Sequence, residues 1–492
     1  MKIDQTNKKL MNSNKKNIEE IKKRIGDSPD IIIKKLSFMK NVIHVIFNET
    51  LCDQQIINKF ILEYFVETPM KSNPENIVKY LSENIPTRKT TKISDFDTLF
   101  YNLFSGFTII LIDGEEEALS IETRFQLDSG IQEAKDEYVL KGPKDAFTEN
   151  YQTNIGQIRR RIKTEKLWLK EVELGTKSKT KIGIMYVSDI ANVELVEQVI
   201  NKIKDIEIDA ILGSNYVIET ISENKRNVFP NYLSTERPDF VAMNLLEGRI
   251  AIIVENMQYV IIIPAVFVDF FHSTEDLYQK SINTTYTRLI RIAALLITLL
   301  VPAIYIAITT FNQEAIPESL IINFAAQRSG VPFPALIEAI LMIITFEILR
   351  ETNLRIPSTL GSALSIVGAI VLGEAAVSAG IVSPIMVIVV AITSISGLTV
   401  SSSDIINGIR WWRIIFIVLA SVSGLLGVLI ASILFILNLA SIKSFGIPYL
   451  SPIAPYYKNN QGNSIFLFNK YKFFKRNSLT AKKNLYRSKE ND

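Results

Sequence analysis

Residues 292–311 read IAALLITLLVPAIYIAITTF, an apolar stretch long enough to cross a lipid bilayer as a helix. Four more stretches of this kind follow it: Phe333–Leu349, Pro357–Val377, Ile381–Val400 and Ile414–Ala440. A soluble protein can bury one or two apolar helices, but five in succession leave no polar face for water. The sequence therefore predicts an α-helical, multi-pass membrane domain with four to five helices over residues 286–440.

The residues before this region have the pattern of a soluble α/β protein. Residues 1–29 are rich in Lys and Asn, and we expect a polar arm there that is flexible or helical. Residues 30–140 combine β-branched runs with the hairpin signal Asp113-Gly114, which predicts a first α/β subdomain. Residues 141–285 again mix expected strands and helices and predict a second α/β subdomain.

Gly248–Pro264 is the ambiguous segment, because it is apolar enough to suggest a membrane span. Glu255-Asn256 interrupts it with residues that favour a turn, and Ile and Val dominate both sides. We therefore predict a β-hairpin in the second subdomain.

Net charge, cysteine content and the amino-terminal sequence indicate which partners and which compartment to expect. A formal net charge of +3 over 492 residues gives no sign of a nucleic-acid partner, and none is expected. The single cysteine, Cys52, excludes an internal disulfide and fits a reducing compartment. No signal peptide is visible at the amino terminus, so we expect the α/β part to be cytoplasmic.

The basic residues near the apolar stretches point to the same orientation. They recur in every second loop: Arg288 and Arg291, then Arg350 and Arg355, then Arg410 and Arg413. Because cytoplasmic loops are enriched in Lys and Arg, this pattern places the amino-terminal domain inside. Residues 441–492 form a Pro-containing segment and a basic tail. Five spans would place that tail outside and four would keep it inside, and the sequence leaves both open.

The third stretch has an unusual composition. Small residues fall on one face of the expected helix, and Glu374 follows one of them in the sequence. Together they are our pore or gate candidates: Ser358, Gly361, Ser362, Ser365, Gly368, Ala369, Gly373 and Glu374. Such a face permits close helix packing, and it equally suits a narrow water-accessible path. Glu374 lies on the opposite face near a helix end, so exposure at the membrane surface is its competing explanation.

Two further acids lie in the second stretch. Glu347 is close to Arg350 in sequence, and we favour an interfacial ion-pair cluster for it. Glu338 lies deeper in the stretch, where a carboxylate is costly and is a functional candidate by default.

The α/β part has no recognisable catalytic constellation. It contains no phosphate-binding glycine loop, and its histidines, His44 and His272, are not in a metal-ligand spacing. Arg159-Arg160-Arg161 reads as a solvated helix face, or as a contact for anionic lipid or an acidic partner. We therefore expect no enzymatic activity, no metal and no cofactor.

Several segments together carry a family resemblance. In the α/β part they are GPKDAFTEN (142–150), TERPD (235–239) and LEGR (246–249). In the remainder they are FEILRETNLRIP (346–357), IVGAIVLGEAAVSAGIVSP (366–384) and YLSPIAP (449–455). The chain resembles the A subunit of GerA-type spore germinant receptors of endospore-forming bacteria. It departs from that family at Glu374, where glutamine is usual, and at Glu255-Asn256, where Asp-Gly is usual.

This resemblance implies a multi-pass protein of the inner spore membrane that works with a permease-like B subunit and a lipoprotein C subunit. It also implies a nutrient-responsive complex in which the A subunit forms a homo-oligomer, contacts lipid and forms or gates an ion-conducting path. A secondary transporter is the alternative, but the short spans give no visible inverted repeat. A membrane-bound enzyme is a more distant alternative.

Overall fold

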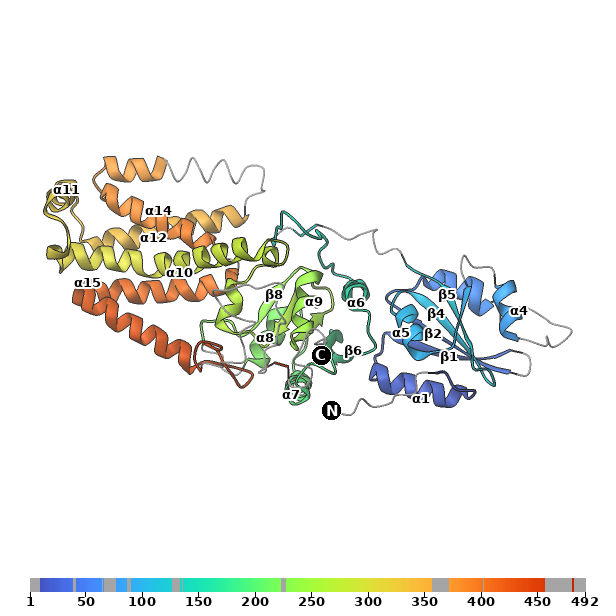
Figure 1. Ribbon diagram of the computed structural model, residues 1–492. Coiled ribbons are helices and arrows are strands. Elements are labelled where there is room, and N and C mark those ends of the chain that lie inside the picture. The colour runs from blue at the N-terminus through green and yellow to red at the C-terminus, as the bar shows by residue number, and fades with distance from the viewer. Residues whose placement is uncertain are drawn as a thin grey trace.

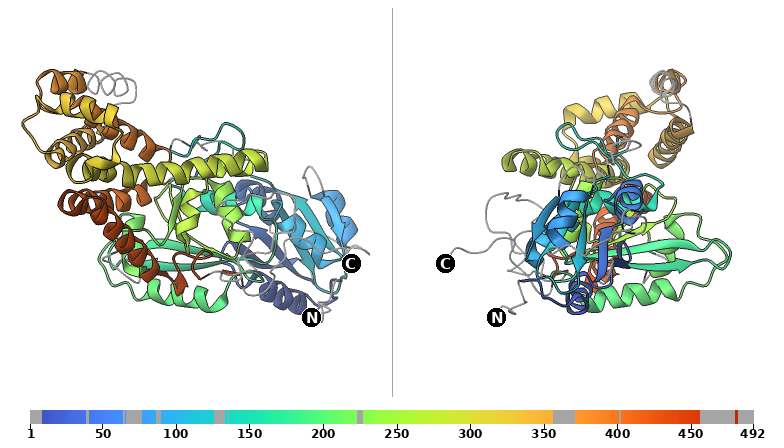
Figure 2. Two further views of the ribbon diagram at one scale, coloured as in Figure 1. Left: turned by 60° about the vertical axis from the view of Figure 1, so that its left-hand side comes forward. Right: turned by 90° about the vertical axis from the view of Figure 1, so that its right-hand side faces the viewer.

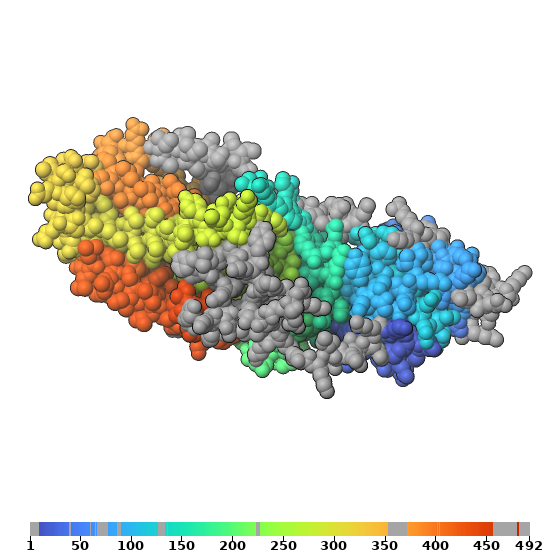
Figure 3. Space-filling view, viewed as in Figure 1, coloured from blue at the N-terminus to red at the C-terminus, as the bar shows by residue number. Residues whose placement is uncertain are grey.

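The computed structural model describes residues 9–38, 41–63, 65, 77–85, 90–125, 133–134, 136–222, 227–355, 371–400, 402–455 and 480–481. Two β-sheets and a group of long helices follow one another along the molecule, as the ribbon and the space-filling view show (Figures 1 and 3). The second sheet lies in the middle, between the first sheet and the helices.

The first sheet is antiparallel, with strand order β1-β2-β4-β5-β3. Its strands are β1 (Ile31–Phe38), β2 (Asn41–Asn48), β3 (Thr90–Ile93), β4 (Phe107–Ile112) and β5 (Ala118–Glu122). One face packs against η1 (Ile57–Leu62), which continues α2 (Gln54–Ile56), and against α4 (Ile77–Asn84); the other face packs against α1 (Asn14–Ile25) and α5 (Phe96–Leu103). β4 and β5 form the hairpin that Asp113-Gly114 predicts.

Of the two forms expected for the polar arm at residues 1–29, the described residues show the helical one. Residues 14–25 form α1, and its Ile21 and Ile25 are buried against the first sheet. The polar composition hides this role, because only one stripe of the helix is apolar.

The second sheet is also antiparallel, with strand order β6-β7-β9-β10-β8. Its strands are β6 (Leu167–Leu174), β7 (Thr180–Val187), β8 (Leu233–Thr235), β9 (Ile250–Val254) and β10 (Val260–Ile263). Helices α6 (Tyr151–Arg161) and α9 (Pro238–Leu246) share a core with one face, and α7 (Val193–Lys204) and α8 (Ser214–Ile221) cover the other. The hairpin predicted for Gly248–Pro264 is confirmed as β9–β10, with Asn256 at a positive φ in its turn.

The triple arginine in α6 is not a solvated face, and this expectation was wrong for two of its members. Arg159 is fully buried and pairs with Asp30 at 2.8 Å, and Arg161 pairs with Asp145 at 2.7 Å. Carboxylates from distant parts of the chain neutralise these charges, which local sequence does not reveal.

The remaining helices begin at the second sheet. They are α10 (Ser281–Thr310), α11 (Glu318–Arg328), α12 (Ala335–Arg355), a helical stretch over 371–378, α14 (Pro384–Leu398) and α15 (Ser403–Ser441), with short 3-10 turns η2 (Phe267–Phe271), η3 (Thr274–Leu277) and η4 (Gln313–Ala315). Two of those described, α10 and Asp404–Ser441 of α15, are long and apolar enough to cross a membrane, and α14 is a shorter apolar helix. One hydrophobic core runs from the second sheet into α10 and α15. Figure 2 shows α10 extending from the second sheet into the helical group.

The stretch Ile414–Ala440 is not the single span that its hydropathy predicts. Gly424 has φ 61° and ψ −140°, and this non-helical residue divides α15 into two arms. Trp412 in the first arm packs edge-on against Phe435 in the second, with 5.3 Å between ring centroids. The arms therefore lie side by side and antiparallel, and α15 is a helical hairpin (Figure 1).

The chain returns to the second sheet after α15. The Tyr449 hydroxyl donates to the Pro230 carbonyl at 2.8 Å, and Ser444 Oγ donates to the Asn231 carbonyl at 3.0 Å. A short ribbon of β11 (Lys443–Ser444) and β12 (Ile447–Pro448) lies in this segment. Further on, Thr480 Oγ1 donates to the Glu247 carbonyl at 2.8 Å. Part of the tail thus lies on the same α/β unit from which α10 departs.

Candidate functional site

Buried ion pairs join the base of α10 to η3, and the start of β9 to η2. Asp276 of η3 receives Arg288 Nε and Arg291 Nη1, each at 2.9 Å. Arg249, which begins the turn into β9, pairs with Asp269 at 2.6 Å. Buried charges persist only when they are paired, so these contacts fix how α10 leaves the α/β part.

The TERPD segment forms a second buried cluster beside this one. Arg237 pairs with Asp239 at 2.8 Å and donates to the Pro143 carbonyl at 2.6 Å. Glu236 Oε1 accepts from the backbone N–H groups of Asp136 and Glu137 at 2.7 and 2.9 Å. These side chains tie the segment before α6 to α9, so the motif positions the backbone.

A cavity of about 910 Å³ lies between the second sheet and the helices. Its charged lining residues come from both sides: Asp136, Glu137, Asp269, Glu347, Arg350, Glu351, Asp404 and Arg410. Burial, opposed by a hydrogen bond from Thr235 and aided by Glu236, raises the pKa of Glu137 to about 7. Burial and three nearby arginines, Arg288 first, lower the pKa of His272, which also lines this cavity. The lining is acidic, so the cavity favours positively charged groups.

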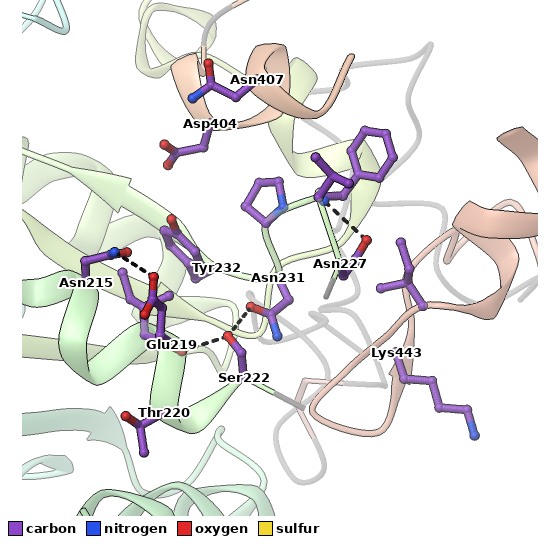
Figure 4. Close-up of a pocket in the computed structure, with 15 residues that line it drawn as sticks. Asn215, Glu219, Thr220, Ser222, Asn227, Asn231, Tyr232, Asp404, Asn407 and Lys443 are labelled. Atoms are coloured by element: carbon purple, nitrogen blue, oxygen red, sulfur yellow. Dashed lines mark hydrogen bonds between the residues drawn. The ribbon is translucent and has the colours of Figure 1, made fainter. Parts of the chain in front are cut away.

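A smaller cavity of about 480 Å³ lies beside the start of α15 (Figure 4). Its walls are α8, the loop 227–232, the first turns of α15 and the residues just after it. Asp404 and Asn407 line both cavities. The first turn of α15 therefore separates two polar spaces at the junction of the sheet and the helices.

The structure places the two predicted intramembrane acids at opposite ends of the helical group. Glu347 receives Arg413 at 3.2 Å and Arg410 at 3.3 Å, at the end near the α/β part. It thus belongs to an ion-pair cluster, with partners from α15 that the sequence did not indicate. Glu338 is buried, accepts from the Ser383 N–H at 2.8 Å and pairs with Arg328 at 3.6 Å.

Few of the pore or gate candidates fall in the described residues. Ser358, Gly361, Ser362, Ser365, Gly368 and Ala369 lie outside them. Glu374 is exposed on the helical stretch 371–378. Gly373 and Ala376 line an apolar cavity of about 190 Å³ against Met342 and Phe346 of α12. Within the described part, small residues of this face therefore meet another helix.

Sequence reasoning missed the acids that organise the junction, Asp269, Asp276 and Asp404. Their only local signal is that each of them lies just before or just after an apolar stretch. Among the described residues, no group of three or more His, Cys, Asp or Glu side chains is placed to hold a metal ion.

The chain is similar to known proteins along most of its length. The sequence model of the family described as "Bacillus/Clostridium GerA spore germination protein" matches residues 19–479. Spore germination protein KA of Bacillus subtilis (strain 168) is 40% identical over 92% of this chain and 84% of that protein. Spore germination protein GerQA of Bacillus cereus is 31% identical over 97% of this chain and 95% of that protein.

Among solved structures, the crystal structure of the N-terminal domain of the A subunit of the Bacillus megaterium spore germinant receptor GerK3 matches 54% of this chain and 99% of that chain, at 32% identity and a TM-score of 0.43. The family match spans both sheets and the helices. The chain therefore belongs to the GerA family of Bacillus and Clostridium spore germination proteins.

Proposed function

We propose that this chain is the membrane-embedded A subunit of a nutrient-responsive germinant receptor, and that its helices form or gate an ion-conducting path in a homo-oligomer. Membership of the GerA family carries the germination role. By the same family relation, its partners are the B and C subunits of the receptor and its location is the inner membrane of the spore.

Insertion of the helices into the membrane is supported by their outer surfaces. Large apolar side chains are exposed on α12, α14 and both arms of α15, among them Ile348, Ile395, Val422 and Ile436. Patches of this kind on a soluble protein would be an aggregation hazard, and lipid covers them without cost. The two arms of α15 measure roughly 30 and 25 Å at 1.5 Å per residue, close to the thickness of a hydrocarbon core.

We propose six crossings where the sequence alone predicts four to five: α10, α12, the third apolar stretch, α14 and the two arms of α15. The contact between Ser383 and Glu338 brings the chain back to the start of α12 before α14 begins. The two arms of the α15 hairpin then add two crossings. Six crossings would put the α/β part and the tail together on the cytoplasmic side, which satisfies the positive-inside rule for both.

Cysteine labelling tests this topology in intact cells that express the chain. Burial raises the pKa of the native Cys52 thiol to about 11, so it contributes little reactivity. Glu314→Cys, between α10 and α11, should react with an impermeant maleimide from outside. Asn463→Cys should react only after permeabilisation, and its labelling in intact cells would contradict six crossings.

Ion flux from proteoliposomes tests the role in signalling. Liposomes that hold this chain with its B and C subunits should release trapped monovalent cations when a nutrient that triggers germination is added. Omission of this chain should abolish the release. Nutrient uptake without ion release would favour the transporter and contradict the proposal.

A further inference from the structure

The 480 Å³ cavity in Figure 4 has the size of a small-molecule site. One wall is apolar and contains Phe229, Pro230 and Ile442. The other carries carboxylates, carboxamides and a phenol from α8, the loop 227–232 and the first turns of α15. A molecule in it would touch the α/β part and both ends of the α15 hairpin.

Asp404 is the most informative lining residue. It is half-buried, and within the described residues its carboxylate makes no hydrogen bond and no ion pair. Three buried acids near this junction, Asp239, Asp269 and Asp276, are each paired with arginine. A desolvated carboxylate without a partner is costly, so this position favours a ligand that brings a positive charge.

The charges around Asp404 do not supply that partner. Lys443 is exposed, and in Figure 4 its side chain points away from the other lining residues. Glu219, on the opposite wall, adds a second carboxylate, which accepts from Asn215 Nδ2 at 3.1 Å. The cavity therefore carries an excess of negative charge.

Tyr232 lies between these two carboxylates. Its hydroxyl is directed toward Asp404 in Figure 4, and it makes no hydrogen bond within the described residues. Burial, followed by the charges of Asp404 and Glu219, raises the pKa of this phenol. A phenol oxygen accepts from an ammonium group, and its ring attracts a cation through its face.

The asparagine carboxamides of the lining supply hydrogen-bond donors. The side-chain oxygens of Asn227, Asn231 and Asn407 accept from the Phe229 N–H, Ser222 Oγ and Arg410 Nη1 at 3.2, 3.2 and 3.1 Å. Because the oxygens are used in this way, the NH₂ groups remain to donate to a ligand. A matching ligand thus carries hydrogen-bond acceptors as well as a cation.

We propose that this cavity binds a small organic ammonium ion that also carries a hydrogen-bond acceptor, with Asp404 and Tyr232 at its cationic end and the carboxamides at its other end. The site is independent of the ion-conducting role proposed above. Its occupant links α8 to the two ends of the hairpin, so binding stabilises this junction.

Ethanolammonium is the probe, and ethylene glycol is its neutral counterpart. The full-length chain in detergent is titrated with each while thermal unfolding and amide exchange at residues 215–222 and 404–408 are followed. Ethanolammonium should raise Tm and slow exchange at both segments, and ethylene glycol should do neither. Equal effects of the two compounds would overturn the proposal.

Asp404→Asn should weaken ethanolammonium binding by about tenfold or more, the loss expected for one charge-assisted hydrogen bond. Its Tm without ligand should be unchanged or higher, because an unpaired charge is removed. Asp205→Asn, on an exposed acid at the end of α7, is the matched control and should bind as the wild type does. Tyr232→Phe should weaken binding severalfold and serves as the second variant. Unchanged binding by both Asp404→Asn and Tyr232→Phe would exclude this site.

The ammonium group can come from a free amine or from a lipid headgroup. In nanodiscs of phosphatidylglycerol alone, ethanolammonium should bind as it does in detergent. If added phosphatidylethanolamine prevents this binding, the headgroup is the natural source, and if it does not, the source is a free amine. Absence of Asp404-dependent binding in both kinds of nanodisc would contradict the proposal.

Discussion

Arg159 and Asp30 lie 129 positions apart and form a fully buried, two-pronged ion pair, with distances of 2.8 Å (Nε to Oδ2) and 2.9 Å (Nη2 to Oδ1). Arg159 Nη1 also donates to the Leu167 carbonyl at 2.6 Å, and its guanidinium lies over the Phe104 ring. Asn48 Nδ2 supplies a further hydrogen bond to Asp30 at 2.9 Å. The pair joins the first sheet to the second, because Asp30 precedes β1 and Arg159 belongs to α6.

Removal of either partner should therefore lower the free energy of unfolding substantially. Asp30→Asn or Arg159→Met should each lower the free energy of unfolding by about 3–5 kcal/mol, because one buried charge is left alone. The matched control is Asp209→Asn, which breaks the exposed pair with Lys177 and should cost about 0.2–1 kcal/mol. Thermal unfolding in detergent measures both. Equal small effects would mean that this pair does not hold the two units together.

The sequence revealed the basic helix but not what its arginines do. The pattern of α6 indicates an amphipathic helix, and a solvated face is the usual fate of three consecutive arginines. The carboxylate that pairs with the buried Arg159 is that of Asp30, in the turn before β1. An ion pair between residues so far apart in the sequence leaves no local pattern. By contrast, the β9–β10 hairpin was predictable because Glu255-Asn256 marks its turn between two β-branched runs.

Gly424 should be irreplaceable at the break in α15. An added Cβ would lie 2.5 Å from Asn312 Oδ1 and 2.8 Å from Phe311 Cβ, and φ is 61°. Gly424→Ala should thus cost more than the about 1–3 kcal/mol expected for a backbone conformation that essentially only glycine adopts. Gly446→Ala is the matched control, since Gly446 also has a positive φ but nothing lies within 4 Å of its Cβ position. Equal losses of thermal stability for the two variants would contradict a crowded tip at Gly424.

This break also shows a limit of hydropathy. Ile414–Ala440 is apolar throughout, and glycine occurs in continuous membrane helices as well as in breaks. The non-helical backbone at Gly424, together with the contacts of Trp412 and Phe416 with Phe435, reveals that the chain reverses. The available signal was the odd number in the five-span alternative, which would place the basic tail outside, against the positive-inside rule.

Glu137 should make stability depend on pH. Its pKa is 4.5 in an unfolded reference and about 7 in the folded protein, where burial is the main cause. Since the folded state holds the proton more tightly, this contribution is complete below about pH 4.5 and is lost as the pH rises through 7. Glu137→Gln should unfold at a higher temperature than the wild type at pH 8, and the difference should shrink toward pH 5. Glu133→Gln, at an exposed acid of the same segment, should show no such trend.

The Glu338 carboxylate should stabilise the folded protein by holding the start of α12 to the residue before α14. Glu338→Gln keeps an acceptor for the Ser383 N–H and should retain most of the folded protein. Glu338→Leu leaves that buried donor unpaired and should cost about 1–3 kcal/mol more. Ion release by both variants should follow the amount of folded protein in the membrane. Loss of ion release by Glu338→Gln at a normal protein level would instead assign this acid to the conducting path.

Ion release by a receptor that carries Ala369→Leu tests the proposed conducting path most directly. We propose that the small face of the third stretch lines or gates the path, so a large side chain there should block nutrient-triggered efflux from proteoliposomes while assembly with the B and C subunits stays normal. Ala363→Leu, which a helical wheel places on the opposite face of the same stretch, beside Glu374 and Ile370, is the matched control and should release ions as the wild type does. Wild-type ion release by Ala369→Leu at a normal protein level would contradict a conducting path at this face.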